Sequence, residues 1–186
     1  DIAGYHRWFP RPDDGIAGEW TPAYIYDPWS LPLLVQAAPD ARFLLMLRDP
    51  LDRFHSAVGF RQRRGASHPD AVRDAFQRGL YSHQVARALV HVPPGRLLVL
   101  SYEQALADPT TVRAATAEFV GLDPTRFAAP VSIRPVAKRA RGRDEVPPTL
   151  LAELRERYRA DIAQLATLLP DVDFGCWPTA HERMPT

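Results

Sequence analysis

The sequence predicts an α/β protein in which helices pack on a parallel β-sheet. Two short apolar runs, residues 43–47 and 97–100, are bounded by Asp, Pro and Gly, as expected for strands buried on both faces. Helical patterns lie between and after these runs, and strands separated by helices favour a parallel sheet with right-handed crossovers. The chain has 186 residues, 46% of them hydrophobic, so we expect a single domain over residues 1–186.

One helix is expected ahead of the first strand. Residues 1–26 are rich in Pro, Gly and aromatic residues without a sustained period, which is typical of an irregular loop. Asp27 and Pro28 suit the N-cap and the first position of a helix over residues 28–38. Pro39 then ends this helix before the strand begins.

The remaining helices follow from apolar spacing. Leu51, Phe54 and Val58 recur at helical intervals directly after the first strand. Similar patterns predict helices over residues 69–78, 80–92, 110–120 and 148–169. Gly121 stands where glycine commonly ends a helix. The last helix carries an apolar face, which predicts core packing for Leu151, Leu154, Tyr158, Ile162, Leu165 and Leu168.

Composition narrows the class of partner. A net charge of +1 provides no overall field to attract nucleic acid or an anionic membrane, so we expect a small-molecule partner. Cys176 is the only cysteine, which excludes an internal disulfide and a cysteine-based zinc site. The printed residues contain neither a charged-then-apolar leader nor an apolar run of about 20 residues, the length that spans a bilayer. We therefore expect a cytoplasmic protein.

A cationic and a hydroxyl side chain flank the turn after the first strand. Arg48 follows that strand, and Ser56 lies eight residues later in the expected helix. Ligands bind at strand ends in α/β sheets, and helix N-terminal amides attract anions, so this pair suits a phosphate. An ordinary surface ion pair of Arg48 with Asp49 or Asp52 is the alternative.

Residues 48–56, RDPLDRFHS, resemble the sulfotransferase segment that binds the 3'-phosphate of 3'-phosphoadenosine 5'-phosphosulfate (PAPS). Residues 97–109 and 117–124 are similar to the same family's pattern of apolar strand, Tyr-Glu, short helix, Asp-Pro and Phe-x-Gly-Leu. The resemblance implies that Arg48 and Ser56 contact the 3'-phosphate and that Tyr102 lines the nucleotide site. It also implies a P-loop NTPase-like three-layer sandwich.

Residues 18–28, GEWTPAYIYDP, resemble the block Gly-Glu-Lys-[Ser/Thr]-Pro-x-Tyr of carbohydrate-type and many bacterial sulfotransferases. The resemblance implies that Glu19 is the general base that takes the acceptor's proton. A solvated glutamate in a loop is the alternative. Trp20 departs from the family's Lys at this position, so a stacking surface for the acceptor replaces a cationic contact.

A basic stretch precedes the last helix. Residues 137–145 hold four cationic side chains around a glycine, enough to bind phosphate or to form a solvated loop. The stretch resembles the loop that closes over PAPS in heparan-sulfate-type enzymes. This resemblance implies contacts to PAPS from Arg141, Gly142 and Arg143.

Three further side chains are candidates for contact with the acceptor. His55 and His83 could reach it, and Tyr5 resembles the family's aromatic segment ahead of the base, although an aromatic residue there also suits the core. The six histidines show no metal-ligand spacing such as His-Glu-x-x-His, so no metal is expected.

The predicted function is transfer of a sulfo group from PAPS to a hydroxyl or amine of a small molecule, glycan or glycolipid. The family's loop for the 5'-phosphosulfate, Pro-[Lys/Arg]-[Ser/Ala]-Gly-[Ser/Thr]-[Ser/Thr], does not occur in the sequence. We therefore expect the N-terminal strand and loop to be missing, and this chain alone to be inactive. A noncatalytic nucleotide-binding or interaction module is the alternative. A P-loop kinase is disfavoured because Gly-x-x-x-x-Gly-Lys-[Ser/Thr] is absent.

Overall fold

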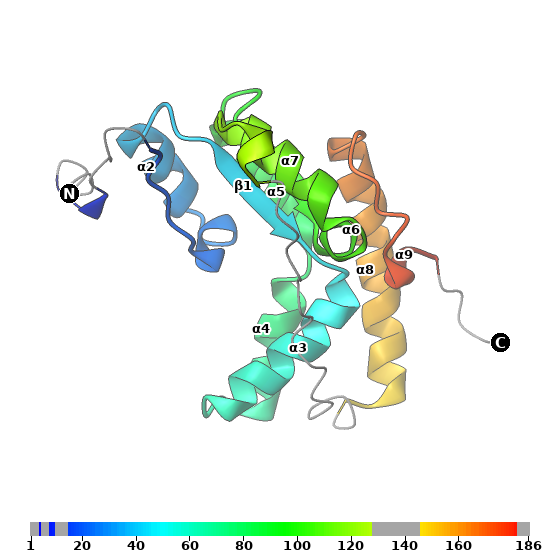
Figure 1. Cartoon of the computed structure of the whole chain (residues 1–186). Coiled ribbons are helices and arrows are strands. Elements are labelled where there is room, and N and C mark those ends of the chain that lie inside the picture. Colours follow the sequence, from blue (N-terminus) through cyan, green and yellow to red (C-terminus); the bar gives the residue numbers. More distant parts are fainter. Residues whose placement is uncertain (1–3, 5–7, 10–14, 128–145, 182–186) are drawn as a thin grey trace.

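The computed structural model describes residues 4, 8–9, 15–127 and 146–181. Two parallel strands pair in register, with Phe43 opposite Leu97 and Leu47 opposite Ser101. They are β1 (Phe43–Leu47) and β2 (Leu97–Ser101). Helices connect and surround them, as Figure 1 shows. The predicted α/β class with a parallel sheet is confirmed, whereas the single domain over residues 1–186 stays a prediction.

The helices match their expected positions to within about two residues at most ends. They are η2 (Pro22–Ile25), α2 (Ser30–Ala37), α3 (Pro50–Arg63), α4 (His68–Gln77), α5 (Tyr81–His91), α6 (Tyr102–Ala107), α7 (Pro109–Val120), η3 (Pro124–Phe127), α8 (Pro148–Leu168) and α9 (Pro178–His181). Gly121 ends α7 in the left-handed conformation, with φ of 81°, as the sequence predicts.

The expected cap of the first helix is wrong. Helix α2 begins at Ser30, and its N-cap residue is Trp29 rather than Asp27. The Asp27 carboxylate instead accepts a hydrogen bond from the Trp29 backbone N–H at 3.0 Å. Asp27 therefore turns the chain three residues ahead of the helix.

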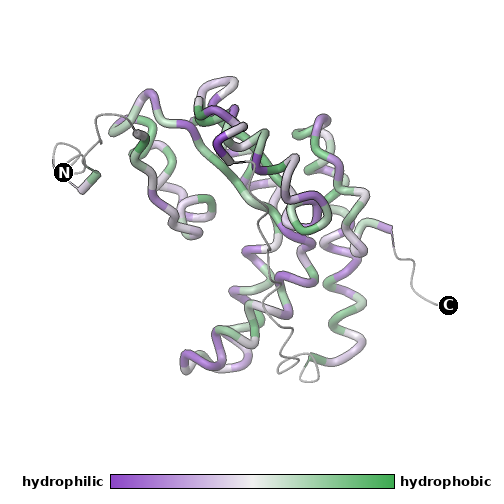
Figure 2. Tube along the Cα trace, viewed as in Figure 1, coloured by the Kyte–Doolittle hydropathy of each residue, from purple (hydrophilic) through white to green (hydrophobic). Residues whose placement is uncertain are grey.

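Strand β1 is buried on one face only, which corrects the expectation of burial on both. Leu44 and Met46 are 47% and 49% exposed, whereas Leu45 and Leu47 pack into the core. Figure 2 shows that the strand is nonetheless hydrophobic along its length. The described sheet has two strands, and α6 and α7 on its outer side pack mainly on β2. Leu44 and Met46 on the outer face of β1 are therefore not covered by other described residues.

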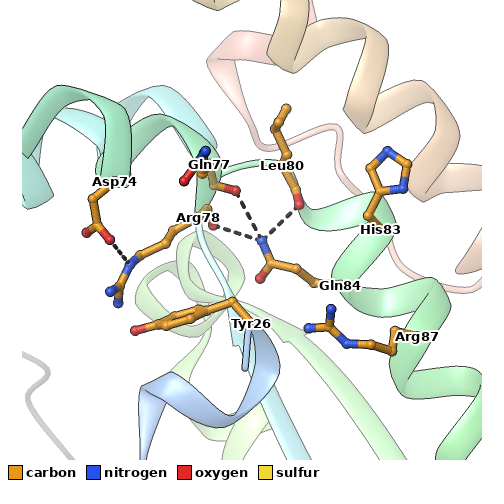
Figure 3. A pocket seen from close by; sticks show the side chains of 8 residues that line it. All are labelled: Tyr26, Asp74, Gln77, Arg78, Leu80, His83, Gln84 and Arg87. Atoms are coloured by element: carbon orange, nitrogen blue, oxygen red, sulfur yellow. Dashed lines mark hydrogen bonds and ion pairs between the residues drawn. The ribbon is translucent and has the colours of Figure 1, made fainter. Parts of the chain in front are cut away.

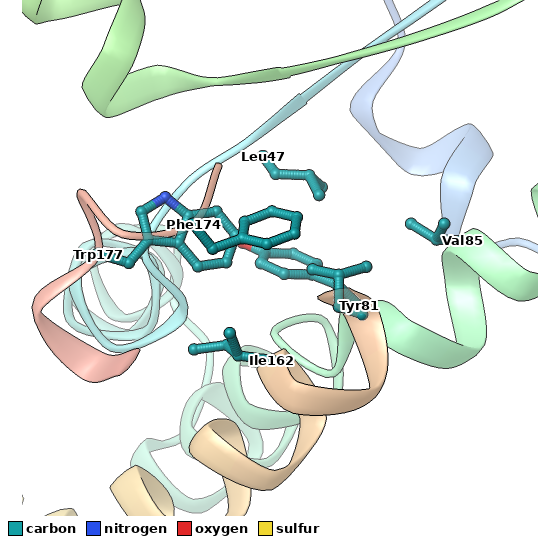
Figure 4. Close-up of a cluster of buried hydrophobic side chains, with 7 residues drawn as sticks. Leu47, Tyr81, Val85, Ile162, Phe174 and Trp177 are labelled. Atoms are coloured by element: carbon teal, nitrogen blue, oxygen red, sulfur yellow. The ribbon is translucent and has the colours of Figure 1, made fainter. Parts of the chain in front are cut away.

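The main core lies at the carboxyl end of β1, where the strand meets α5, α8 and the C-terminal segment. Figure 4 shows aromatic rings from Tyr81, Phe174 and Trp177 gathered beside Leu47. The Phe174 and Trp177 ring centroids are 4.7 Å apart. Residues 174–177 therefore anchor the C-terminal segment to the strand end.

A second core joins α3, α4 and α8. Its buried residues are Phe54, Val58, Ala71, Ala75, Val146, Leu154 and Tyr158. Leu154 and Tyr158 belong to the apolar face predicted for the last helix, and Ile162 and Leu165 extend that face into the first core. The prediction of core packing for this face is confirmed at these four positions.

Helix α5 is capped by a side chain from a distant helix. Its own N-cap residue, Leu80, has no capping side chain. The buried carboxylate of Asp161 on α8 instead accepts hydrogen bonds from the backbone N–H groups of Tyr81 at 2.7 Å and Ser82 at 3.2 Å. This cap fixes the first turn of α5.

Within the described part of the chain, no helix is both long enough and apolar enough to cross a membrane.

Candidate functional site

Arg48 and Tyr102 come together at the carboxyl ends of the two strands. The guanidinium carbon of Arg48 lies 5.2 Å from the centroid of the Tyr102 ring. The Arg48 Nη2 atom is 3.5 Å from the Asp52 carboxylate, and its Nε atom is 4.0 Å from that of Glu103. The ion pair with Asp52, which was the alternative for Arg48, is therefore present.

The amides at the start of α3 already have an internal partner. The Asp49 carboxylate accepts hydrogen bonds from the backbone N–H groups of Leu51 and Asp52, each at 3.0 Å. Its other contacts come from the backbone N–H and the hydroxyl of Thr179, both at 2.9 Å. A phosphate at this strand end would thus be bound by side chains, and the expected contribution of free helix amides is wrong.

Glu103 joins the two strand ends to the C-terminal segment. One carboxylate oxygen accepts a hydrogen bond from the Asp49 backbone N–H at 3.1 Å. The other accepts from the Ser101 hydroxyl at 3.1 Å and from the Trp177 indole N–H at 2.8 Å. Sequence reasoning missed Glu103 and Trp177 as parts of the site, although Glu103 lies in the Tyr-Glu pair.

One donor of Arg48 fits an additional ligand. Its Nε atom is buried and has no hydrogen-bond partner among the described residues. A buried unpaired donor is costly to leave unsatisfied, so an anion that reaches it is favoured. Ser56 lies two turns into α3, with its side chain exposed. No described contact joins Ser56 to Arg48.

Glu19 lies apart from the residues around Arg48, on the segment that leads into η2. Its carboxylate is exposed and accepts a hydrogen bond from the Tyr24 hydroxyl at 3.1 Å. Trp20 is 90% exposed, so its indole is open to a ligand. The described contacts do not join Glu19 directly to Arg48.

A cavity of about 320 Å³ opens between the η2 segment and the turn from α4 to α5 (Figure 3). Its lining residues are Tyr26, Asp74, Gln77, Arg78, Leu80, His83, Gln84 and Arg87. His83 thus lines a cavity, whereas His55 lies on α3 with its ring 5.7 Å from the Phe54 ring. Sequence reasoning missed Arg78 and Arg87, because neither belongs to a recognisable motif.

Tyr5, Arg141, Gly142 and Arg143 lie outside the described residues. Within the described ranges, no group of three His, Cys, Asp or Glu side chains could hold a metal ion.

Comparison with known proteins finds similar sequences among sulfotransferases. The chain is 28% identical over 138 residues to two mouse proteins, heparan sulfate glucosamine 3-O-sulfotransferases 3A1 and 3B1. The matches cover 65% of this chain and 35% of each relative, so the chain spans about a third of their length.

The fold resembles the crystal structure of a sulfotransferase from Alicyclobacillus acidocaldarius. The TM-score is 0.65 at 24% sequence identity, and the match covers 94% of this chain and 78% of that one. A model of the Sulfotransferase family matches residues 3–126, a range that includes Glu19, Arg48 and Tyr102. Since this match takes in more than half of the sequence, the chain belongs to the sulfotransferase family.

Proposed function

We propose that this chain takes part in transferring a sulfo group from PAPS to a hydroxyl or amine of a glycan or another small acceptor. The observation that carries the proposal is the position of Arg48 beside Tyr102 at the strand ends, with a buried Nε that makes no hydrogen bond among the described residues. Family membership supports sulfo transfer in general. The heparan sulfate enzymes among the relatives support a glycan as the acceptor.

Arg48 would bind the 3'-phosphate of the nucleotide. A phosphate is a stronger partner for a guanidinium than the loose contact of 3.5 Å with Asp52, so it can replace that carboxylate. Ser56 would donate its hydroxyl to the same phosphate, and Tyr102 would line the nucleotide site. Arg141, Gly142 and Arg143 remain candidates for closing over PAPS.

Glu19 would act as the general base toward the acceptor. PAPS supplies a sulfo group activated by its phosphate leaving group. As the acceptor oxygen or nitrogen bonds to sulfur, its proton passes to the Glu19 carboxylate and the sulfur–oxygen bond to the phosphate breaks. Adenosine 3',5'-bisphosphate is then the second product. The hydrogen bond from Tyr24 would orient the carboxylate.

A further segment of the parent protein would hold the 5'-phosphosulfate, because the family's loop for that group does not occur in these 186 residues. The same absence favours the second candidate function, a noncatalytic nucleotide-binding or interaction module. The predicted cytoplasmic location likewise remains part of this proposal.

Nucleotide binding by the chain tests the donor site without requiring turnover. Arg48→Ala is expected to weaken binding of adenosine 3',5'-bisphosphate by roughly 10- to 100-fold, since hydrogen bonds to charged groups contribute about 1.5–3 kcal/mol. Binding of adenosine 5'-monophosphate, which lacks the 3'-phosphate, should change much less. Calorimetry measures both affinities.

The matched control is Arg63→Ala, which removes an exposed arginine from the far end of α3. It should leave both affinities unchanged. Equal losses for the two nucleotides in Arg48→Ala would refute the assignment of the 3'-phosphate site. No detectable binding of either nucleotide to the wild-type chain would count against a donor site in these residues.

A further inference from the structure

The cavity beside η2 has the size and the walls of a ligand site. Its volume of about 320 Å³ falls within the roughly 300–1,000 Å³ that is typical of small-molecule pockets. It opens between Tyr26, just after η2, and the turn that joins α4 to α5. In Figure 3, Arg78 and Arg87 lie on opposite sides of Tyr26.

Positive charge exceeds negative charge at this cavity. Asp74 is the one carboxylate among the lining residues, and it is shared between two guanidinium groups. Its oxygens lie 2.8 Å from Arg78 Nε and 3.6 Å from Arg61 Nε. Arg87 adds the second guanidinium of the lining, so the two arginines outweigh its one carboxylate. The surplus favours an anionic ligand.

Two arginines are held in place, and their side chains form part of the cavity wall. The guanidinium carbon of Arg78 stacks 3.9 Å from the centroid of the Tyr26 ring. Arg87 Nη2 donates to the Ile25 carbonyl at 2.6 Å, while its buried Nε has no hydrogen-bond partner among the described residues. Burial lowers the pKa of Arg78 from its ordinary value, because the charged form loses hydration. A bound anion would offset that loss.

The amide of Gln84 is already engaged. Its Nε2 atom donates to the Leu80 carbonyl at 2.8 Å and lies within 3.4 Å of the Gln77 and Arg78 carbonyls. The charged donors of this wall are therefore the arginine guanidinium groups. A ligand with a carboxylate or sulfate matches them better than a neutral polyol does.

The cavity belongs to the same segment as the candidate base. Arg87 binds the carbonyl of Ile25, and the neighbouring residue Tyr24 donates its hydroxyl to Glu19. A ligand group held by Arg87 would therefore lie along the segment that presents the Glu19 carboxylate.

We propose that Arg78 and Arg87 form a subsite for an oxyanion of the sulfo acceptor, either a carboxylate or a sulfate ester of an acidic saccharide. This inference rests on the proposed function, because it assigns the cavity to the acceptor of that reaction. The two planar guanidinium groups would each bind an oxyanion through paired N–H donors. The subsite would thereby select acidic over neutral saccharides.

Calorimetry with defined saccharides tests the subsite directly. The probes are a glucuronate-containing tetrasaccharide without sulfate, a sulfated heparin tetrasaccharide and neutral maltotetraose, at about 0.15 M salt to screen weak surface attraction. We expect both acidic probes to bind and the neutral one to bind at least about tenfold more weakly. Because both acidic probes carry uronate carboxylates, tighter binding of the sulfated probe would show that sulfate esters add to the recognition, and equal binding would show that the carboxylates suffice.

Two variants locate the binding. Arg87→Ala and Arg78→Gln should each weaken binding of the acidic probes about tenfold or more. Arg73→Ala, which removes a 71% exposed arginine from α4, is the matched control and should bind like the wild-type chain. Thermal unfolding establishes that each variant is folded, and Arg78→Gln stands in if Arg87→Ala is not.

Three outcomes would overturn the subsite: equal binding of neutral and acidic probes, equal losses in Arg73→Ala, or unchanged affinity in both cavity variants. Titration with adenosine 3',5'-bisphosphate in the same samples reports separately on the proposed function. Loss of saccharide binding with intact nucleotide binding identifies the cavity as the acceptor subsite. Failure of nucleotide binding in the wild-type chain would contradict the donor site alone.

Discussion

The indole N–H of Trp177 donates a hydrogen bond to the carboxylate of Glu103 across 74 positions of the chain, at a distance of 2.8 Å. Trp177 is fully buried, and the same carboxylate receives the Asp49 backbone N–H beside Arg48. The C-terminal segment therefore stabilises the turn that contains Arg48, the candidate residue for binding phosphate.

Replacing Trp177 with Phe tests this support. The variant keeps an aromatic ring but removes the N–H donor, so the Glu103 carboxylate loses a charged hydrogen bond worth about 1.5–3 kcal/mol. The free energy of unfolding in urea should fall by about that amount. Trp29→Phe, at a site that is 75% exposed, is the control and should change stability by no more than about 0.5 kcal/mol. Equal effects of the two substitutions would contradict the proposed support.

Glu19→Gln tests the general base in a parent protein that carries the phosphosulfate loop. The amide keeps the size of the carboxylate and can accept the Tyr24 hydrogen bond, but it cannot take the acceptor's proton. The turnover number should fall about 100- to 10,000-fold, the usual contribution of a general base. Affinity for adenosine 3',5'-bisphosphate should hardly change. Near-normal turnover would direct attention to His55 and His83 as the next candidates.

The absence of the family's phosphosulfate loop from the sequence leads to another prediction about activity. These 186 residues should not transfer sulfate from PAPS, because they lack the family's loop for the 5'-phosphosulfate. Supplying a strand and loop of the family's phosphosulfate-binding type ahead of residue 1 should permit transfer, as measured by release of adenosine 3',5'-bisphosphate. Ordinary turnover by the 186 residues alone would show that other side chains bind the phosphosulfate.

Gly79→Ala tests the close packing of the α4–α5 turn. A Cβ atom added at Gly79 would lie 2.7 Å from the hydroxyl of the buried Tyr158, closer than the two atoms can approach. Tyr158 would have to move, and its hydrogen bond to the Phe76 carbonyl at 3.2 Å would be disturbed. Overpacking of this kind costs about 1–3 kcal/mol, measurable by urea unfolding. Gly95→Asn, at an open left-handed position, is a milder control.

Acid sensitivity should include a contribution from Asp108, the cap of α7. Hydrogen bonds from the side chain and then the backbone N–H of Thr111 lower the pKa of Asp108 from its ordinary value of 3.8. A lowered pKa in the folded state means that the stabilisation is complete above the unfolded value and is lost as the pH falls through the folded one. Asn caps helices well without titrating. As the pH falls from about 5 to 3, the melting temperature of Asp108→Asn should therefore rise relative to that of the wild-type chain.

Local sequence patterns were sufficient to predict the helices and strands, but they were not sufficient to predict the contacts between them. The apolar run at Phe43 and the glycine at position 121 predict a strand and a helix end because both depend on nearby residues. The Asp27 cap was predicted wrongly, since its carboxylate turns toward Trp29 instead. Asp161 caps α5 from another helix, a contact that no local pattern contains.

The same distinction applies to the candidate site, where some residues could be predicted from the sequence and others could not. Arg48 and Tyr102 could be assigned to one nucleotide site because both stand in segments that resemble the sulfotransferase family, and in the structure the parallel strands bring their carboxyl ends to one edge. Trp177 could not be placed there, because its contact with Glu103 depends on how the last segment folds back over the sheet. Arg87 could not be connected with the cavity either, since its partner is the backbone carbonyl of Ile25 rather than a recognisable side chain.

The single cysteine allows a fluorescent dye to be attached beside the strand ends. Cys176 is exposed, and its sulfur lies 3.4 Å from the Ser101 hydroxyl, next to Trp177. With one thiol in 186 residues, a maleimide dye would attach at a single place. Nucleotide that reorganises Arg48 and Glu103 would then change the dye's emission, and the Trp177 indole would serve as a built-in quencher or energy donor.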